Sequence, residues 1–188
     1  MIGAEPSEFL KNSEARATMT ALSLVELLTQ SGRTLVLAES CTAGLVSDLI
    51  ARISGASAVL WGSFVSYSQK AKELMLDLDG GLIERCGLVS REVVSEMAIH
   101  ALRKSGASFS AAVTGLAGPL GDGSATPVGT VWIALAFLGS AGEAELAMER
   151  KMCFRGSRAE VRMQAAVTVL EELLNLAVRT VDKKLRTA

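Results

Sequence analysis

The stretch 34–53 constrains the fold most, because a strand-like run changes within a few residues into a helix-like run. Residues 34–37 are apolar and of β type. Apolar side chains then recur at helical spacing at Leu45, Val46, Leu49, Ile50 and Ile53. The turn between them, 38–44, has the sequence AESCTAG. Such a turn presents its side chains at the carboxyl edge of a sheet, and it directs the free N–H groups of the following helix towards an anion or an oxyanion.

The same alternation of strands and helices continues along the chain. Periodicity and turn signals predict helices over 15–30, 45–53, from about 69 to Leu78, 91–105 and 156–182. They predict strands over 34–37, 58–67, 109–114, 128–138 and 145–154. This order predicts the α/β class, as a three-layer α/β/α sandwich with a mixed, mostly parallel sheet. We expect residues 1–14 to form a polar N-terminal tail and residues 15–182 to form a single domain.

Composition narrows the classes of function. The chain has 188 residues, 49% of them hydrophobic and 21% charged, which suits one globular domain. A net charge of −1 with dispersed basic residues, and only 4% aromatic residues, argues against a nucleic-acid binder and favours a small ligand. The longest apolar run, 131–138, is too short to span a bilayer, and no signal-type segment begins the chain. We therefore expect a cytoplasmic protein without membrane contact.

The cysteines and the single histidine exclude several catalytic devices. Cys41, Cys86 and Cys153 are odd in number and widely spaced, so neither a disulfide framework nor a Cys-x-x-Cys site is predicted. His100 lies within a helical run, which argues against a Ser-His-Asp or Cys-His arrangement and against zinc. The carboxylates that follow the strands show no metal-ligand spacing, so no metal is expected.

Ser40 remains the candidate nucleophile, and a lysine from another segment is the candidate base. A lysine can activate serine when burial keeps it neutral. Lys70 and Lys72 lie at a second strand-to-helix junction, where Tyr67 could relay a proton or orient the base. The alternatives are ordinary: serine and threonine commonly cap helices, and lysines commonly lie on solvated helix faces. The glycine-rich loop 115–127 could bring its backbone close to a ligand, or could be a flexible connection.

Six segments, taken in order, closely resemble the CinA C-terminal domain family. They are residues 38–44, 62–68 with Ala71 and Lys72, 87–90, 114–119, 127–132 and 154–158. Each segment is weak alone, but the combination is specific and extends over roughly residues 20–180. The resemblance implies hydrolysis of nicotinamide mononucleotide to nicotinate mononucleotide and ammonia, in NAD recycling, without a metal or other cofactor. It also implies the form of the family without the additional N-terminal domain of larger members, and a homodimer.

The resemblance also implies roles for individual residues. Ser40 matches the family's nucleophile and Lys72 its general base, while Tyr67 and Thr114 match polar residues that line the site. Arg158 matches the arginine of the family's Gly-x-Arg segment. The N–H groups near Cys41 and Thr42, or in the loop that includes Gly115 and Gly118, would bind the oxyanion. The expected catalytic residues are thus Ser40, Lys72 and Tyr67, and the expected substrate-binding residues are Cys41, Thr42, Thr114, Gly115, Gly118 and Arg158.

The chain departs from the family pattern at two positions. Ala43 stands where a second glycine is usual, and Ser157 replaces an acidic or amide residue before Arg158. The second departure leaves the orientation of Arg158 open. A different class of function also remains: a nucleotide-binding or regulatory module of the same family, without turnover. Replacing Ser40 with alanine would distinguish the two.

Overall fold

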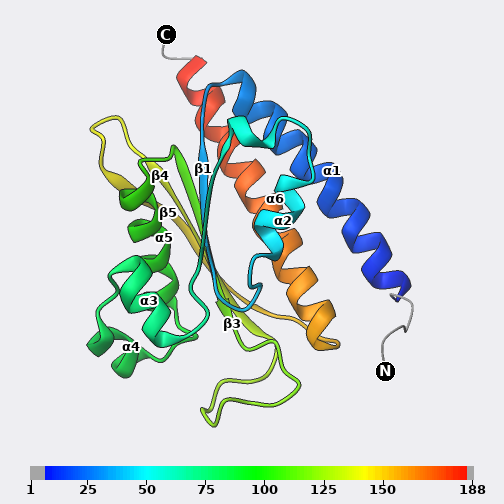
Figure 1. Cartoon of the computed structure of the whole chain (residues 1–188), viewed down its shortest axis with the longest axis vertical. Helices are drawn as coiled ribbons and strands as arrows, with labels where there is room; N and C mark the ends of the chain where they lie inside the picture. The colour runs from blue at the N-terminus through cyan, green and yellow to red at the C-terminus, as the bar shows by residue number, and fades with distance from the viewer. Residues whose placement is uncertain (1–6, 186–188) are drawn as a thin grey trace.

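The computed structural model describes residues 7–185 and shows a five-stranded sheet between two layers of helices (Figure 1). The strands are β1 Leu35–Glu39, β2 Leu60–Val65, β3 Phe109–Gly115, β4 Thr130–Leu138 and β5 Ala144–Cys153. Their order across the sheet is β2-β1-β3-β4-β5. β1 is parallel to both of its neighbours, whereas β4 is antiparallel to β3 and to β5. The predicted three-layer architecture with a mixed sheet is confirmed.

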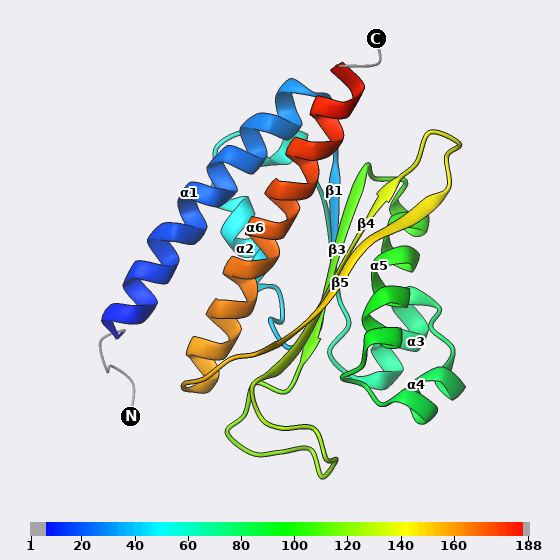
Figure 2. The ribbon, with the colours of Figure 1, turned by 180° about the vertical axis from the view of Figure 1, so that it is seen from behind.

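Helices cover both faces of the sheet. One face carries α1 Glu8–Gln30, α2 Leu45–Ala51 and α6 Arg158–Leu185. The other carries α3 Gln69–Leu76, α4 Gly80–Cys86 and α5 Arg91–Ser105, as the view from behind also shows (Figure 2). A short 3-10 turn, Ala56–Ala58, precedes β2. None of the helices within residues 7–185 is both long and apolar enough to cross a bilayer.

The side chains of β1 explain why its first four residues, 35–38, are continuously apolar. All five residues of this strand are buried. Leu35 and Leu37 belong to the core beneath α1, α2 and α6, whereas Val36 and Ala38 belong to the core beneath α5. A central strand covered on both faces needs apolar residues at every position rather than at alternate ones.

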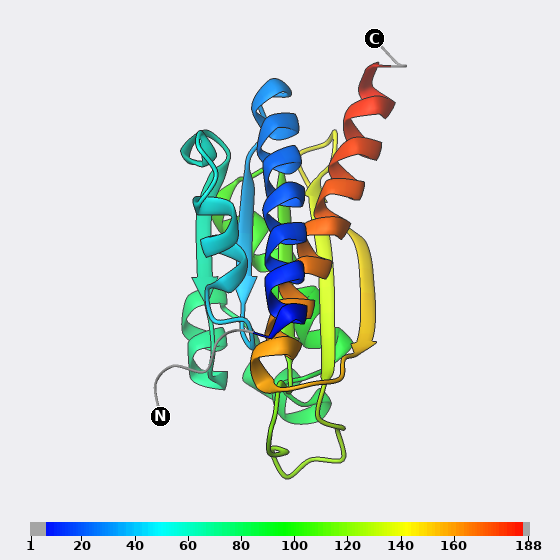
Figure 3. The same ribbon diagram turned by 90° about the vertical axis from the view of Figure 1, so that its right-hand side faces the viewer.

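The first helix begins earlier than the sequence predicted. α1 begins at Glu8, so the expected tail over residues 1–14 is wrong for residues 8–14, while residues 1–6 lie outside the described part of the chain. The Ser7 hydroxyl accepts a hydrogen bond from the Leu10 N–H and donates one to Glu160 on α6. α1 and α6 pack side by side (Figure 3). These N-terminal turns lack an apolar stripe, and their order instead comes from a cap and a polar contact.

A second difference lies between β2 and α5. Periodicity predicts no helix between Leu78 and Arg91, but α4 begins at Gly80. The Asp79 carboxylate accepts hydrogen bonds from the N–H groups of Gly81 and Leu82. Gly80 and Gly81 lower the helix propensity of this segment, so the sequence did not predict α4. The Asp79 cap stabilises the start of the helix.

Candidate active site

The two strand-to-helix junctions predicted from the sequence meet at one edge of the sheet. In the parallel register, Glu39 pairs with Val65 on one side and with Val113 on the other, so the carboxyl ends of β1, β2 and β3 coincide. The connection from β1 to β2 contains α2, and that from β2 to β3 contains α5 on the opposite face. Chains that leave a sheet towards opposite faces open a crevice at that edge, the usual site of ligand binding in such folds.

The Ser40 turn is fixed by a buried carboxylate. Glu39, 1% exposed, accepts hydrogen bonds from the N–H groups of Gly44, Val46 and Ser47 at 2.9, 3.1 and 3.0 Å. The Ser63 hydroxyl donates a fourth bond at 3.2 Å. Capping of α2 by a serine or threonine hydroxyl is therefore wrong, because the side chain of Glu39 provides the cap. The expectation that these helix N–H groups bind a ligand is wrong for the same reason: Glu39 already occupies them.

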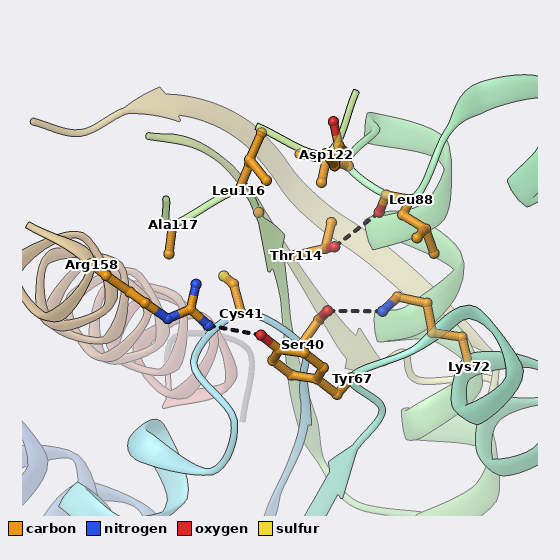
Figure 4. A pocket seen from close by; sticks show the side chains of 12 residues that line it. Ser40, Cys41, Tyr67, Lys72, Leu88, Thr114, Leu116, Ala117, Asp122 and Arg158 are labelled. Carbon is orange, nitrogen blue, oxygen red and sulfur yellow. Dashed lines mark hydrogen bonds between the residues drawn. The ribbon is translucent and has the colours of Figure 1, made fainter. Parts of the chain in front are cut away.

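Lys72 directs its amine at Ser40 from the second turn of α3. Its side chain is fully buried, and Nζ donates hydrogen bonds to Ser40 Oγ at 2.8 Å and to the Ser66 carbonyl at 2.7 Å (Figure 4). Lys70, by contrast, is exposed and pairs with Glu73. The structure therefore brings only Lys72 of the two candidate lysines to Ser40.

Burial changes the protonation of both ionisable groups beside Ser40. Desolvation lowers the pKa of Lys72 from 10.5 to about 8, so about a tenth of this amine is neutral at pH 7. Desolvation raises the pKa of the Cys41 thiol to about 11, although the positive charges of Lys72 and Arg162 act in the opposite direction. The thiol therefore stays protonated near neutral pH, which leaves the Ser40 hydroxyl as the better-placed nucleophile.

A cavity of about 160 Å³ opens above these groups. Seven of the nine predicted site residues line it: Ser40, Cys41, Tyr67, Lys72, Thr114, Gly115 and Arg158. It is completed by Leu88, Val89, Leu116, Ala117 and Asp122, which the sequence did not single out as its lining. The Thr114 hydroxyl donates to the Leu88 carbonyl at 2.9 Å, and this bond ties the end of β3 to the segment before α5.

Arg158 joins three separate segments at the cavity. Its guanidinium donates to the Tyr67 hydroxyl at 2.7 Å and to the Gly118 carbonyl at 2.8 Å (Figure 4). Tyr67 was expected to relay a proton or to orient the base. Within the described residues, its hydroxyl bonds to Arg158 and makes no hydrogen bond to Lys72.

Two predicted substrate-binding residues lie outside the cavity lining. Thr42 is fully buried, and its hydroxyl oxygen has no hydrogen-bond partner among the described residues. Gly118 contributes its carbonyl to Arg158 but does not line the cavity itself. His100 serves the structure, since its Nδ1 donates to the Leu76 carbonyl at 2.6 Å and so joins α5 to α3.

The two departures from the family pattern have structural consequences. Ala43 adopts a positive φ of 50°, a left-handed conformation that glycine adopts without cost. Ser157 begins α6 with a capping box: its N–H and hydroxyl donate to Glu160 at 2.8 and 3.0 Å. Ser157 therefore secures the helix start, and Tyr67 and Gly118 orient Arg158.

Sequence reasoning missed two groups beside Ser40. Arg162 donates to the carbonyls of Cys41 and Thr42, and the Ser66 carbonyl accepts from Lys72. The spacing of Arg158 and Arg162, four residues apart, could have placed both on one helix face. A backbone acceptor such as Ser66 leaves no signal in the sequence. No group of three or more histidine, cysteine, aspartate or glutamate residues in the described chain is placed to hold a metal.

Comparison with known proteins identifies the family of this chain. The family model described as "CinA C-terminal domain" matches residues 17–177. The nicotinamide-nucleotide amidohydrolase PncC of Enterobacter agglomerans is 39% identical over 162 residues, which are 86% of this chain and 96% of that protein. A CinA-like protein of Syntrophomonas wolfei is 39% identical over 155 residues, 82% of this chain but only 36% of that longer protein.

A solved structure shows the same fold. The competence/damage inducible protein CihA from Agrobacterium tumefaciens superimposes with a TM-score of 0.79 and 34% identity, and the match covers 86% of this chain and 95% of that one. Since the family model and the relatives extend over most of the sequence, the chain belongs to the CinA C-terminal domain family.

Proposed function

We propose that this chain hydrolyses nicotinamide mononucleotide to nicotinate mononucleotide and ammonia, with Ser40 as nucleophile and Lys72 as general base. The observation that carries the proposal is the buried Lys72 amine, 2.8 Å from Ser40 Oγ and with its pKa lowered to about 8. A pocket that only bound a nucleotide would not need a buried lysine with a lowered pKa hydrogen-bonded to a serine hydroxyl. The name of the Enterobacter agglomerans relative supports the same reaction.

In the first half of the reaction, Ser40 attacks the carboxamide carbon of the substrate. Neutral Lys72 accepts the hydroxyl proton as Oγ forms its bond to carbon. The tetrahedral intermediate then expels its amino group, which takes the proton from Lys72 and leaves as ammonia. The remaining acyl group is an ester on Ser40.

In the second half, water attacks the acyl carbon. Lys72 accepts a proton from the water and returns it to Ser40 Oγ as the ester bond breaks, which releases nicotinate mononucleotide. Because the Lys72 amine also donates to the Ser66 carbonyl, it holds one orientation through both proton transfers.

The oxyanion needs donors that the fold does not already use. Among the hydrogen bonds of the described residues, none uses the N–H of Thr42, and the N–H of Cys41 interacts only with the sulfur of its own side chain. We assign the oxyanion to these groups, and each well-placed donor contributes about 3 kcal/mol to the transition state.

Arg158 is the proposed ligand of the substrate phosphate. Its guanidinium is exposed beside the cavity, and both of its acceptors, Tyr67 and Gly118, are uncharged. A cavity of about 160 Å³ is smaller than the roughly 300–1,000 Å³ typical of ligand pockets. The cavity therefore suits the nicotinamide ring, and the ribose phosphate would extend from it to Arg158 at the exposed edge.

The test is an assay of purified protein with nicotinamide mononucleotide, without added metal, that follows both ammonia and nicotinate mononucleotide. Ser40→Ala and Lys72→Ala should each lower kcat by about 1,000-fold or more. Lys70→Ala removes an exposed lysine from the same helix and should keep wild-type activity. In the wild type, kcat/KM should rise with pH and level off above about pH 8, where Lys72 is neutral.

A folded wild type that binds the nucleotide but releases no ammonia would refute this function. That result would favour the nucleotide-binding module. Retention of activity in Lys72→Ala would refute the assignment of the base alone.

A further inference from the structure

Arg162 lies near the C-terminal end of the sequence and donates hydrogen bonds to the turn that directly follows Ser40. It lies on α6, is half-buried, and donates from Nε to the Cys41 carbonyl at 3.2 Å and from Nη2 to the Thr42 carbonyl at 2.6 Å. None of the ion pairs among the described residues includes Arg162. Its side-chain hydrogen bonds are therefore made to two successive peptide carbonyls directly after Ser40.

These two contacts fix the orientation of the peptide groups. The Cys41 carbonyl and the Thr42 N–H belong to one trans peptide unit, so they point in opposite directions. When Arg162 binds the carbonyl, the Thr42 N–H is directed away from the guanidinium. The neighbouring peptide is held as well, because the Ala43 N–H donates to the Ser40 carbonyl at 3.1 Å and so orients the Cys41 N–H.

The turn contains a residue in an unfavourable conformation, which such a contact helps to hold. Ala43 adopts a left-handed conformation there, which is unfavourable for a residue with a Cβ atom. Glu39 fixes the chain from Gly44 onwards, but it makes no hydrogen bond to Cys41 or Thr42. Two backbone hydrogen bonds hold this segment, from the Ala43 N–H to the Ser40 carbonyl and from the Leu45 N–H to the Thr42 carbonyl, and Arg162 adds a side-chain restraint at the Cys41 carbonyl. An arginine suits this position, since its planar fork reaches two acceptors at once where a lysine offers a single nitrogen.

We propose that Arg162 is a positioning residue: by binding the carbonyls of Cys41 and Thr42, it fixes the turn after Ser40 and presents the Thr42 N–H to the oxyanion that forms when Ser40 attacks. This inference rests on the proposed amidohydrolase function and adds a residue to it. Arg162 acts through the backbone of the turn, so its effect belongs to the transition state and not to substrate binding.

The variants are Arg162→Gln and Arg162→Lys, with Arg179→Gln as the matched control. Arg179 lies on the same helix and also donates to a carbonyl, that of Asn175, but is exposed and distant in sequence from the site. For Arg162→Gln we expect kcat to fall on the order of 100-fold with KM within threefold of the wild type. Arg162→Lys, which can keep one of the two contacts, should recover part of kcat, and Arg179→Gln should match the wild type.

A second measurement reports on the oxyanion site directly. Pyridine-3-boronic acid adds to a serine: Oγ forms a bond to boron, the hydroxyl proton passes to Lys72, and one boron oxygen takes the place of the oxyanion. We expect Arg162→Gln to weaken this inhibitor by about the same factor as kcat, while thermal unfolding shows a folded protein. A purely structural role would lower stability without this parallel loss.

Three outcomes would overturn the inference: kcat within threefold of the wild type in Arg162→Gln, a rise in KM with kcat unchanged, or boronate affinity that does not follow kcat. If Arg162→Gln does not fold, Arg162→Lys decides by the same criteria. A wild type inactive on nicotinamide mononucleotide would count against the proposed function. The boronate comparison would still test Arg162, because it needs Ser40, Lys72 and the turn but no turnover of the nucleotide.

Discussion

Replacing Lys72 with methionine should reveal how much stability the buried amine costs. Lys72 is fully buried, and its pKa falls from 10.5 in the unfolded chain to about 8 in the folded protein. This difference corresponds to about 3 kcal/mol of destabilisation wherever the lysine is protonated in both states. Methionine has a similar length and carries no charge. The variant also loses two hydrogen bonds, to Ser40 and Ser66, worth about 1 kcal/mol each.

The sign of the effect depends on pH. Between about pH 8 and 10.5 the unfolded wild type binds more protons at this lysine than the folded protein does, so wild-type stability rises with pH across that window. Below about pH 8 the full penalty applies. At pH 7 the variant should be more stable than the wild type by about 1 kcal/mol. By pH 10 the wild type should have gained about 2 to 3 kcal/mol relative to the variant, so the order reverses.

The assay is urea unfolding of both proteins at about pH 7 and about pH 10. Lys70→Met serves as a control, because it removes an exposed amine from the same helix. A difference in unfolding free energy between wild type and Lys72→Met that stays constant with pH would refute the argument. The proposed base would then lack the desolvated environment that its chemistry needs.

Two further predictions concern the turn around Ser40. Ala43→Gly relieves a left-handed alanine, worth about 1–2 kcal/mol, against a glycine entropy cost of about 0.5–1 kcal/mol. In urea unfolding the variant should therefore be as stable as the wild type or up to about 1.5 kcal/mol more stable. A loss of stability above about 1 kcal/mol would contradict the strain. Glu39→Ala leaves three N–H groups of α2 without their acceptor and should lower the unfolding free energy by about 3 kcal/mol, whereas Ser63→Ala, which removes only the fourth bond to that carboxylate, should cost about 1 kcal/mol. Equal losses in the two variants would show that the carboxylate is not the cap.

The clustering of Ser40, Tyr67, Lys72 and Thr114 could be predicted from the sequence because parallel strands bring their carboxyl ends to one edge. The sequence also contains a signal that distinguishes Lys72 from Lys70 as the lysine that faces the site. Lys72 and Leu76 lie four residues apart and are both fully buried, so they share the inward face of α3.

Other parts of the site depend on contacts that residue types do not specify. The Ser66, Cys41 and Thr42 carbonyls act as acceptors, and any residue at these positions would offer the same group. The sequence did not predict that Glu39 caps α2, because Glu39 precedes the helix by six residues. Its carboxylate reaches the helix N-terminus only when the intervening turn has folded back. The early start of α1 depends on the Ser7 cap and on the contact of Ser7 with Glu160 of α6, and no local pattern records that second contact.

Because α1 packs against α6, the first helix finds its partner only after the last helix has been synthesised. Arg16 on α1 pairs with Glu171 on α6, and Arg162 binds the turn after Ser40 from more than a hundred residues away in sequence. During translation, β1 and the turn at Ser40 emerge from the ribosome early, and α6 emerges last of the described elements. The larger hydrophobic core therefore stays open to solvent until the final helix emerges, and such an exposed sheet face is a surface that chaperones bind. The two hydrogen bonds from Arg162 to the Ser40 turn can form only after α6 has been synthesised.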